Sequence, residues 1–572
     1  MAFQVSPGIN VTEQDLTTVV PNVATTIGAT AGGFQWGPVL ERTQISSEND
    51  LVNIFGKPNA DTYTWFWTAA NYLAYANNLW VVRNVAASAR NAVVGDDDAG
   101  TAVAVNNKTA YDSVTFTDQL FVAKYPGALG NSLKVRAIDS NGWADATVNT
   151  DFLANFDRAP GTSTDVGNAG GSEDEMHILV QDEDGLWTGT PGYVLEKHAF
   201  VSKASDAKKI DGASNYVVDV MRNESKYAYV GLVTQFTTNS TGSEKAAGLP
   251  KAGGAFLTFN SATASESVPG GSLAGGVSGD TQTDALLQAS YALYQTPEVI
   301  DITLLLGGAS STTTGRWIID NVAATRKDCM AFVSPALASV VNNPGSEVTA
   351  LTTDNTALGS SSYAVMDSAW KYQYDRYRDI FMYVPMNGDM AGLCARTDYT
   401  NDAWWSPAGL TRGTIKNIVK LSWEATKANR DTMYPISINP VITQTGAGVV
   451  LWGDKTMQTV PSAFDRINVR RLFIVLEKAI SKAAKAMLFE FNDEFTRAQF
   501  VNMVSPFLRD VQGRRGITDF KVVCDSSNNT GQVIDTNNFV GDIYIKPSRS
   551  INYIQLNFIA ARTDVSFSEI GG

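Results

Sequence analysis

The sequence has 572 residues, of which 44% are hydrophobic and 18% are charged, a length that corresponds to roughly three to four domains with their own cores. Its 44 basic and 58 acidic residues give a net charge of −14, which argues against non-specific nucleic-acid binding because that binding needs basic stripes to displace counterions. Three cysteines without a CxxC pair exclude a disulfide framework and disfavour zinc, and no run of apolar residues is long enough to indicate a membrane span.

The first twelve residues alternate between apolar and polar positions. Phe3, Val5, Ile9 and Val11 share one face, with Pro7 in register. Because proline cannot donate a hydrogen bond to a strand ladder, this pattern predicts an edge strand or an extended arm.

Helix-like and strand-like segments then alternate along much of the chain. Residues 62–78 predict an aromatic-rich amphipathic helix, and residues 79–85 predict a buried strand. The later members of the series are helices at 284–295 and 315–327 and strands at 299–306 and 329–334. Such alternation predicts an α/β layer with right-handed crossovers.

Residues 91–190 differ from the rest of the chain in composition. They carry 16 acidic and 5 basic residues, a balance of −11 out of the total of −14. Short runs at 114–123 and 133–138 are typical of strands. This segment is predicted to be an inserted, solvent-facing, β-rich domain whose charge keeps neighbouring copies soluble and apart.

Residues able to support catalysis are sparse and carry no recognisable signature. The two histidines, His177 and His198, have no sequence-readable nucleophile partner and are interpreted as surface or hydrogen-bonded residues. Lys57 precedes a proline, so it does not belong to a phosphate-binding loop. The acidic clusters at 96–98 and 182–184 lack the oxygen pattern of a calcium loop. The chain is therefore predicted to be neither an enzyme nor a binder of metals or cofactors.

The segment 363–383 is dense in aromatic and charged side chains. Interleaved basic and aromatic residues can stack on single-stranded nucleic acid. However, Asp375 and Asp379 lie within the run, and the whole chain is acidic. A packed strip between domains or subunits is the favoured interpretation.

Residues 466–490 form the longest predicted helix, with two stripes. The apolar stripe is Val469, Phe473, Leu476, Ile480, Ala484 and Met487. The basic stripe is Arg471, Lys478, Lys482 and Lys485. Arg471 lies about 200° around the helix from Val469, so the basic stripe is predicted to face away from the core. This stripe is either a solvated helix face or a cationic ridge that docks on an acidic partner.

Three strands are predicted near the C-terminus, at 518–524, 540–546 and 551–561. Alternation in the last one continues into the terminal residues, and the apolar positions are Ile554, Leu556, Phe558, Val565 and Phe567. Each end of the chain therefore either folds back on its own sheet or adds a strand to the sheet of a neighbour. In the second case the contact is heterologous and builds stacked rings or helical filaments.

The order of several strings resembles the tail sheath proteins of contractile-tailed bacteriophages. The N-terminal strings are SPGINVTEQD (6–15), GATAGGFQWGP (28–38), KYPGALGNSLKV (124–135) and LAGGVSG (273–279). The C-terminal strings are CARTD (394–398), PAGLTRG (407–413), INVRRLFIVLEKAI (467–480), FEFNDE (489–494), NNFVGDIYIKP (537–547) and INYIQLNFIA (551–560). Relatives often have proline where Phe491 stands.

Pattern and resemblance together predict a multidomain α+β or α/β protein. Residues 1–22 are expected to form an N-terminal arm that packs on the C-terminal domain or on a neighbouring subunit. The remaining expected parts are a middle α/β domain at 23–90 and 191–365, the inserted acidic β-rich outer domain at 91–190, and an α/β sheath domain with a terminal strand arm at 366–572.

The resemblance implies a structural subunit of a contractile sheath. Such subunits form hexameric rings stacked around a tail tube, and they contract to drive the tube through the host envelope. The implied partners are further copies of the chain, the tube protein, and the baseplate and terminator proteins, without nucleic acid or membrane insertion. The implied location is the virion, after assembly in the cytoplasm of the host bacterium.

The resemblance also assigns roles to the two ends and to the basic stripe. The apolar residues of the ends would lie in exchanged arms, and the four basic residues would face the tube. The alternative to a sheath subunit is another structural component of a phage or phage-like particle, such as a baseplate protein, which would form closed oligomers.

Overall fold

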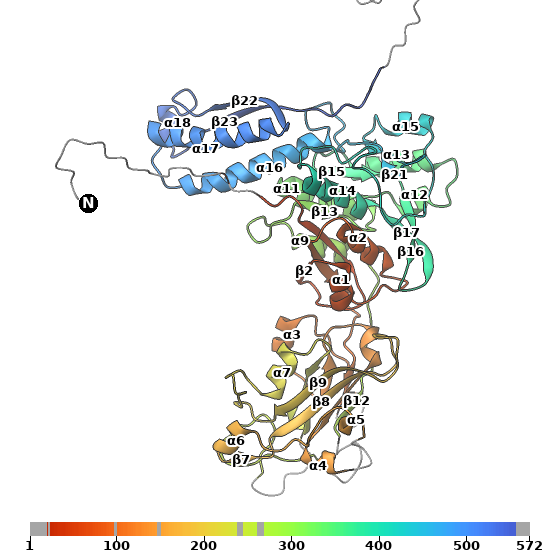
Figure 1. The fold of residues 1–572 in the computed structure, drawn as a ribbon, viewed down its shortest axis with the longest axis vertical. Coiled ribbons are helices and arrows are strands. Elements are labelled where there is room, and N and C mark those ends of the chain that lie inside the picture. The colour runs from red at the N-terminus through yellow and green to blue at the C-terminus, as the bar shows by residue number, and fades with distance from the viewer. Residues whose placement is uncertain are drawn as a thin grey trace, which may run out of the picture. The chain divides into compact units, whose positions relative to one another are not determined.

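The computed structural model describes residues 20, 23–95, 100–145, 150–236, 244–259 and 268–555. The chain divides into two compact units (Figure 1). The C-terminal unit comprises Met1–Val23, Asn401–Ser406 and Arg466–Gly572, and the large unit comprises Ala24–Thr400 and Pro407–Asp465.

A seven-stranded sheet forms the centre of the large unit, in the order β19-β15-β14-β13-β1-β3-β2. All neighbouring strands are parallel except β2, which pairs antiparallel with β3. The strands are β1 (Gly28–Gly33), β2 (Arg42–Ile45), β3 (Leu79–Asn84), β13 (Leu304–Leu306), β14 (Met330–Val333), β15 (Ala364–Asp367) and β19 (Ile438–Asn439). The sheet confirms the α/β layer that the alternating segments predict.

Helices cover the sheet, as its uninterrupted apolar strands require. They are α1 (Glu48–Phe55), α2 (Tyr63–Leu73), α9 (Asp284–Ala292), α10 (Thr312–Ile318), the π-helical turn η3 (Ile319–Ala323), α11 (Ala324–Arg326), α12 (Leu337–Val340), α13 (Glu347–Leu358), α14 (Asn387–Thr400) and α15 (Lys427–Met433). The predicted helix at 315–327 is thus a continuous run of α10, η3 and α11.

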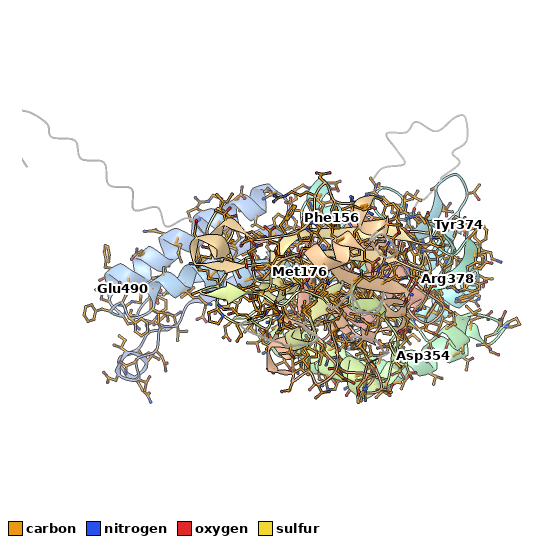
Figure 2. All side chains as sticks on the ribbon, turned by 90° about the horizontal axis from the view of Figure 1, so that it is seen from below. Phe156, Met176, Asp354, Tyr374, Arg378 and Glu490 are labelled. Atoms are coloured by element: carbon orange, nitrogen blue, oxygen red, sulfur yellow. The ribbon has the colours of Figure 1, made fainter. Side chains whose placement is uncertain are left out.

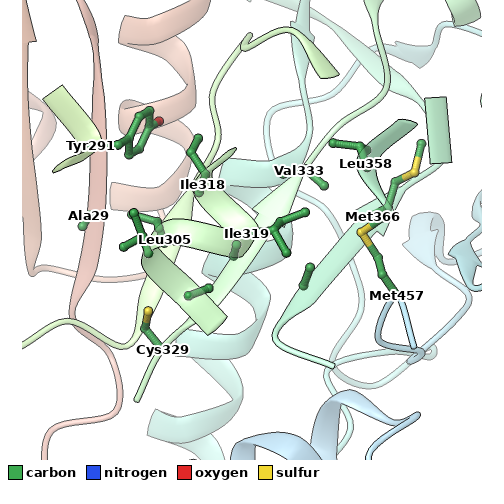
Figure 3. Packing of buried hydrophobic residues seen from close by; sticks show 14 of the residues in the cluster. Ala29, Tyr291, Leu305, Ile318, Ile319, Cys329, Val333, Leu358, Met366 and Met457 are labelled. Atoms are coloured by element: carbon green, nitrogen blue, oxygen red, sulfur yellow. The ribbon is translucent and has the colours of Figure 1, made fainter. Parts of the chain in front are cut away.

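Small residues on β1 allow helices to approach both of its faces. A Cβ atom on Gly32 would lie 2.4 Å from the Trp65 ring of α2. Ala29 belongs to a core cluster that also contains Tyr291 of α9 and Leu305 of β13 (Figure 3). The alternation of glycine and alanine in β1 therefore serves close packing on two sides.

Two further sheets belong to the large unit. One has the order β17-β16-β18, and the other is the hairpin of β20 and β21. The strands are β16 (Trp370–Asp375), β17 (Ile380–Pro385), β18 (Lys420–Leu421), β20 (Val441–Gln444) and β21 (Gly448–Leu451).

The inserted region is larger than the expected 91–190. Its sheets have the orders β12-β6-β8-β9, β10-β5-β4 and β11-β7. Its elements are β4 (Val93–Val94), α3 (Lys108–Ser113), β5 (Phe121–Ala123), η1 (Ala128–Ser132), β6 (Leu133–Ile138), α4 (Ser140–Ala144), α5 (Thr150–Leu153), α6 (Thr164–Asn168), β7 (Gly171–Ser172), β8 (Glu175–Asp182), β9 (Tyr193–Ser202), α7 (Val217–Asn223), β10 (Ala228–Val230), η2 (Val233–Phe236), β11 (Gly254–Ala255) and β12 (Gly270–Ser272).

Strand pairing moves the far boundary of the insert. Strands β9, β10 and β12 pair with β8, β5 and β6, which precede residue 190. Arg90 and Val277 bridge the two connecting segments. The expected boundary at 190 is therefore wrong, because it would cut these sheets and assign residues 191–277 to the middle domain.

Arg83 anchors the point where the chain leaves the central sheet for the insert. Its guanidinium is fully buried and donates to the carbonyl oxygens of Phe34 (2.7 Å), Gly37 (2.8 Å) and Pro126 (2.7 Å). Burial lowers the pKa of the Arg83 guanidinium to about 9. The Arg83 side chain thus satisfies carbonyl oxygens of the loop after β1 and of the insert.

The C-terminal unit contains two long helices and a hairpin. Its elements are α16 (Ile467–Ala484), η4 (Lys485–Met487), α17 (Glu494–Gly513), β22 (Ile517–Val523), α18 (Gly531–Asp535) and β23 (Asp542–Pro547). A separate core cluster includes Leu476 of α16, Val504 of α17 and Ile517 of β22.

The expected domain boundary at 366 is also wrong. Residue 366 lies inside β15, and β19 at Ile438–Asn439 pairs with β15 in the same central sheet. The long continuous segment of the C-terminal unit begins at Arg466. A strand that joins the sheet late in the sequence is not visible from local periodicity, because its pairing partner is distant.

Candidate assembly surfaces

The N-terminal turns of α16 are buried on every side. Val469, Arg470 and Leu472 are all buried, as are the neighbouring positions from Ile467 to Leu472. Beyond this point only the stripe through Leu476 and Ile480 stays buried. The helix thus begins inside the unit and ends at its surface.

This arrangement contradicts the orientation predicted for Arg471. Its side chain is only 4% exposed. The prediction was wrong because it assumed that only one face of the helix is covered along its whole length. Lys478 is half-buried, whereas Lys482 and Lys485 are exposed. The exposed part of the basic stripe is therefore confined to the last turn, where cations also interact favourably with the helix dipole.

The next helix begins with a fixed cap. The Asp493 carboxylate accepts a hydrogen bond from the Thr496 backbone N–H at 2.8 Å, and this bond lowers the pKa of Asp493. The loop before it is held by the Asn492 side chain, which donates to the Asn538 carbonyl at 2.8 Å. The connection between α16 and α17 is therefore locally ordered.

Strands β22 and β23 form a two-stranded antiparallel hairpin. The pairing runs from Ile517 with Pro547 to Val523 with Asp542, with an irregularity between Ile517 and Asp519. Helix α17 packs on one face of the hairpin, and Tyr544 is exposed. Among the described residues, no further strand pairs with either outer edge. Open edges of this kind are templates for additional strands.

The tail that follows β23 carries exposed apolar side chains. Residues 551–555 have no regular secondary structure, so the described part of the predicted strand at 551–561 is not a strand in the structure. Ile551, Tyr553 and Ile554 are all exposed. The other arm residues lie outside the described part of the chain: Phe3, Val5, Ile9, Val11, Leu556, Phe558, Val565 and Phe567.

Sequence reasoning missed one apolar surface in this unit. Leu488, Phe489, Phe491 and Phe495 are exposed in and beside the loop between η4 and α17, near the labelled Glu490 in Figure 2. The signal was present, because three phenylalanines stand within seven residues beside Asn and Asp, a composition typical of a loop rather than a core.

The aromatic segment 363–383 begins with β15 of the central sheet and continues into the hairpin of β16 and β17, which includes the labelled Tyr374 (Figure 2). Tyr374 and Phe381 are paired across the strands, exposed, and have ring centroids 5.2 Å apart. On the covered face, the Asn71 side chain donates to Gln373 at 3.0 Å. The expectation that this segment is a strip between domains or subunits stays a prediction.

Three buried polar side chains of the large unit form one hydrogen-bonded network. The Lys371 ammonium donates to the Asp389 carboxylate at 2.9 Å, and the Tyr75 hydroxyl donates to the same carboxylate at 3.2 Å. All three side chains are buried. Burial raises the pKa of Asp389 and of Tyr75 and lowers the pKa of Lys371. The network joins the turn after α2 to β16 and α14, and its role is structural.

The usual ligand position of a doubly wound sheet is filled by side chains. Chain order reverses between β1 and β13, and ligands of such sheets bind beyond the carboxyl ends of the strands at this place. Here Asn387 exchanges two hydrogen bonds with Gly308, and Trp65 would contact a Cβ atom on Gly308 at 2.3 Å. Among the described residues, no group of three or more potential metal ligands is present.

His177 is a hydrogen-bonded core residue, as predicted. Its Nδ1 accepts from the Phe200 backbone N–H at 3.1 Å, and its Nε2 lies 3.0 Å from the Arg158 carbonyl. Burial lowers the pKa of His177.

No helix in the described part of the chain is long and apolar enough to cross a membrane.

Comparison with known proteins covers both units. The family model for the phage tail sheath protein central domain matches residues 286–457, and the model for the phage tail sheath C-terminal domain matches residues 459–561. The junction of the two matches lies close to the start of the C-terminal unit at Arg466.

Two viral proteins match almost the whole chain. The tail sheath protein of Vibrio phage KVP40 is 33% identical over 671 residues, covering 99% of each chain. The tail sheath protein of Enterobacteria phage T4 is 32% identical over 657 residues, again covering 99% of each chain.

Solved structures share the fold. The sheath complex of an extracellular contractile injection system, PVC, in the contracted state has a TM-score of 0.52 and 13% identity, covering 98% of this chain and 99% of that chain. The sheath tail protein of Listeria innocua has a TM-score of 0.52 and 12% identity, covering 92% of this chain and 96% of that chain. With viral relatives matched at about one third identity from end to end, the chain belongs to the family of phage tail sheath proteins.

Proposed function

We propose that this protein polymerises as stacked hexameric rings around a tail tube and contracts to drive the tube through the host envelope. The observation that carries the proposal is the hairpin of β22 and β23, which has two open edges among the described residues and is followed by an extended apolar tail. A two-stranded sheet is marginal on its own and gains stability from added strands. Strands contributed by other copies supply them.

Strand addition between copies is heterologous, because the donated segment and the accepting edge are different surfaces. Such contacts do not have to close, and they generate helical polymers. Residues 1–15 and 551–570 are the exchanged arms in this proposal. Contraction then repacks the surfaces between copies while the arms keep the subunits connected.

The remaining partners follow from the same role. Lys482 and Lys485 are the tube-facing candidates that remain exposed, and Lys478 adds a half-buried third cation. The acidic insert faces outward, away from the tube, where its charge separates neighbours. The baseplate and terminator proteins bind the two ends of the sheath. The protein is a non-enzymatic component of the virion that assembles in the host cytoplasm.

The test removes each arm separately. Deletion of residues 1–15, or of residues 551–572, is expected to leave a folded monomer that does not form tubes in negative-stain electron microscopy at any concentration. Thermal unfolding of the monomer, compared with the full chain, controls for misfolding. Normal tubes from both truncated chains would overturn the proposal of strand exchange. Closed rings from the full chain would overturn the proposal that the protein forms a helical polymer.

A second test addresses the tube. Charge reversal at Lys482 and Lys485 is expected to weaken co-sedimentation with the tube protein while sparing tube-free sheath formation, because exposed charges act through complementarity with a partner. The same reversal at Lys427, which is exposed in the large unit and pairs with Asp431, is the matched control. Unchanged co-sedimentation at physiological salt would show that the basic end of α16 is only solvated.

A further inference from the structure

The loop between the two long helices of the C-terminal unit exposes an unusual amount of apolar surface. Leu488 is 62% exposed, Phe489 104%, Phe491 83% and Phe495 70%. We call these four residues the apex. At about 150–250 Å² for a buried aromatic side chain, the apex leaves on the order of 500 Å² of apolar surface in contact with water. Contiguous patches of this size on soluble chains mark interaction sites.

The apex is held in place rather than loosely attached. The Arg497 guanidinium donates to the Asn492 side-chain oxygen at 2.9 Å, and the Asp493 cap fixes the start of α17. Phe489 has a backbone φ of 72°, a conformation that bulky residues avoid because it is strained. An ordered loop that holds a phenylalanine in a strained conformation and points it into solvent indicates a surface formed for a partner.

The same unit exposes a second apolar surface at its other end. Ile551, Tyr553 and Ile554 of the tail are 81%, 83% and 77% exposed. The tail begins where the Ser548 backbone N–H donates to the Gly516 carbonyl at 3.1 Å, beside the C-terminal end of α17. The apex lies at the N-terminal end of the same helix (Figure 1).

The tail of one copy cannot cover the apex of that copy. Helix α17 has 20 residues and is therefore about 30 Å long. The seven residues from Ser548 to Ile554 are joined by six Cα–Cα steps, which span at most about 20 Å when fully extended. Two apolar surfaces at opposite ends of one unit, out of each other's reach, are complementary only between copies.

We propose that the apex is the docking site for Ile551, Tyr553 and Ile554 of a second copy of this chain. The proposal rests on the proposed self-assembly and deepens it, because it adds a side-chain contact to the backbone pairing of the arms. The contact is heterologous, so each copy offers one apex and one tail, and the chain of contacts does not close by itself. A stable interface buries about 800 Å² on each partner, so the apex supplies more than half and the paired strand supplies the rest.

Cysteine cross-linking tests this contact directly. The native cysteines Cys329, Cys394 and Cys524 are all buried, so an introduced surface thiol is the one available to an oxidant. A chain with Phe491→Cys is mixed with a chain with Ile554→Cys under polymerising conditions, and diamide takes up the two hydrogen atoms as the disulfide forms. Disulfide-linked dimers are expected in the mixture and not in either variant alone.

A matched pair controls for random collision. Ile210 is fully exposed in the insert, and a chain with Ile210→Cys mixed with the Ile554→Cys chain is expected to give no dimer. Tubes that form without a link between Phe491→Cys and Ile554→Cys would overturn the apex contact and leave the sheath proposal standing. Wild-type chain that forms no polymer, even with tube protein added, would overturn both.

A second measurement removes the apolar surface without any cross-link. Phe489→Ser combined with Phe491→Ser is expected to raise the critical concentration for polymerisation by at least about tenfold, because aromatic anchors dominate such contacts. The melting temperature of the monomer should not change, since both side chains are exposed. Ile210→Ser is the control that leaves polymerisation unchanged. An unaltered critical concentration for the double variant would contradict the proposal.

Discussion

The central sheet of the large unit and the hairpin of the C-terminal unit use β-structure in opposite ways. The parallel sheet is covered on both faces, and even its charged neighbours, such as Lys371 and Asp389, are paired within the chain. The hairpin is covered on one face by α17, leaves Tyr544 exposed, and has no strand on either outer edge among the described residues.

The two β-structures differ in how much of each is covered within one chain. In the large unit, the buried side chains of Lys371 and Asp389 are paired with each other within the chain. The C-terminal unit leaves both hairpin edges open among the described residues and exposes several apolar side chains. If other copies add strands to these edges, as proposed, the stability of this unit depends on protomer concentration. Variants and conditions that affect the two units differently test this distinction.

The largest effect is expected from breaking the buried ion pair. Lys371→Met removes the cation beside Asp389 and leaves the buried carboxylate without a counter-charge, with the Tyr75 hydroxyl as its remaining donor. Loss of one partner of such a pair costs about 3–5 kcal/mol. Chemical denaturation of the purified monomer should show this decrease in the unfolding free energy of the large unit.

The control for this variant is an ion pair on the surface of the same unit. Lys427 and Asp431 lie 3.0 Å apart one helical turn from each other, and both are exposed. Lys427→Met should change the unfolding free energy by less than about 0.5 kcal/mol. Equal effects of the two substitutions would contradict the view that the buried pair of Lys371 and Asp389 stabilises the large unit.

Hydrogen exchange compares the two types of β-structure in one experiment. Amides of β13 and β14, which lie inside the central sheet, should exchange at least about 100-fold more slowly in the monomer than those of β22 and β23. In assembled tubes the hairpin amides should become protected while the central sheet changes little. Equal protection of both regions in the monomer would show that the hairpin is stable without added strands.

The pH dependence of stability should belong to the large unit. Asp367 is buried and accepts a hydrogen bond from the Ser334 hydroxyl, and burial raises its pKa to about 8. The folded state therefore binds one proton more than the unfolded state between about pH 4 and pH 8. The unfolding free energy should fall as pH rises through this window, by at most about 1.4 kcal/mol per pH unit.

Asp367→Asn should flatten this dependence, because an amide does not titrate. Urea denaturation at several pH values between 5 and 8 measures the slope. Asp320→Asn, at an exposed position paired with Arg316 one turn away, should leave the slope as it is in the wild type. A slope that persists in the Asp367→Asn variant would assign the titration to another group.

Local pattern predicted several elements of the central sheet and its helices, because each of these is encoded by nearby residues. The strand at 79–85 is β3 (Leu79–Asn84), and the helix at 284–295 is α9 (Asp284–Ala292). Domain limits were not predictable in the same way. Strand β19 pairs with β15 across many residues of sequence, and local periodicity carries no information about such partners.

The candidate site shows the same limit. The helical spacing located the basic residues of α16 correctly, but it did not show that Arg471 is buried while Lys482 and Lys485 are exposed. Which sides of a helix are covered depends on the elements that pack around it. The apex residues were missed because phenylalanine by itself predicts burial, although the neighbouring Asn and Asp are typical of a loop; the structure shows these rings in solvent.

The smallest effect on the monomer is expected on the outward face of the hairpin. Tyr544 is 60% exposed and lies opposite Lys521 across the strands. Tyr544→Ser should change the unfolding free energy of the monomer by less than about 0.5 kcal/mol, as is usual at exposed positions. If the hairpin gains strands from other copies, cross-strand contacts of this aromatic ring become part of a larger sheet.

The same substitution should therefore raise the critical concentration for tube formation, which sedimentation measures. Tyr193→Ser in β9 of the insert is the matched control, because that tyrosine is also exposed at the surface of a strand. If Tyr544→Ser lowers the unfolding free energy of the monomer as much as a core substitution does, the hairpin is already complete within one chain. An effect on assembly without an effect on the monomer would place the missing part of this sheet on another copy.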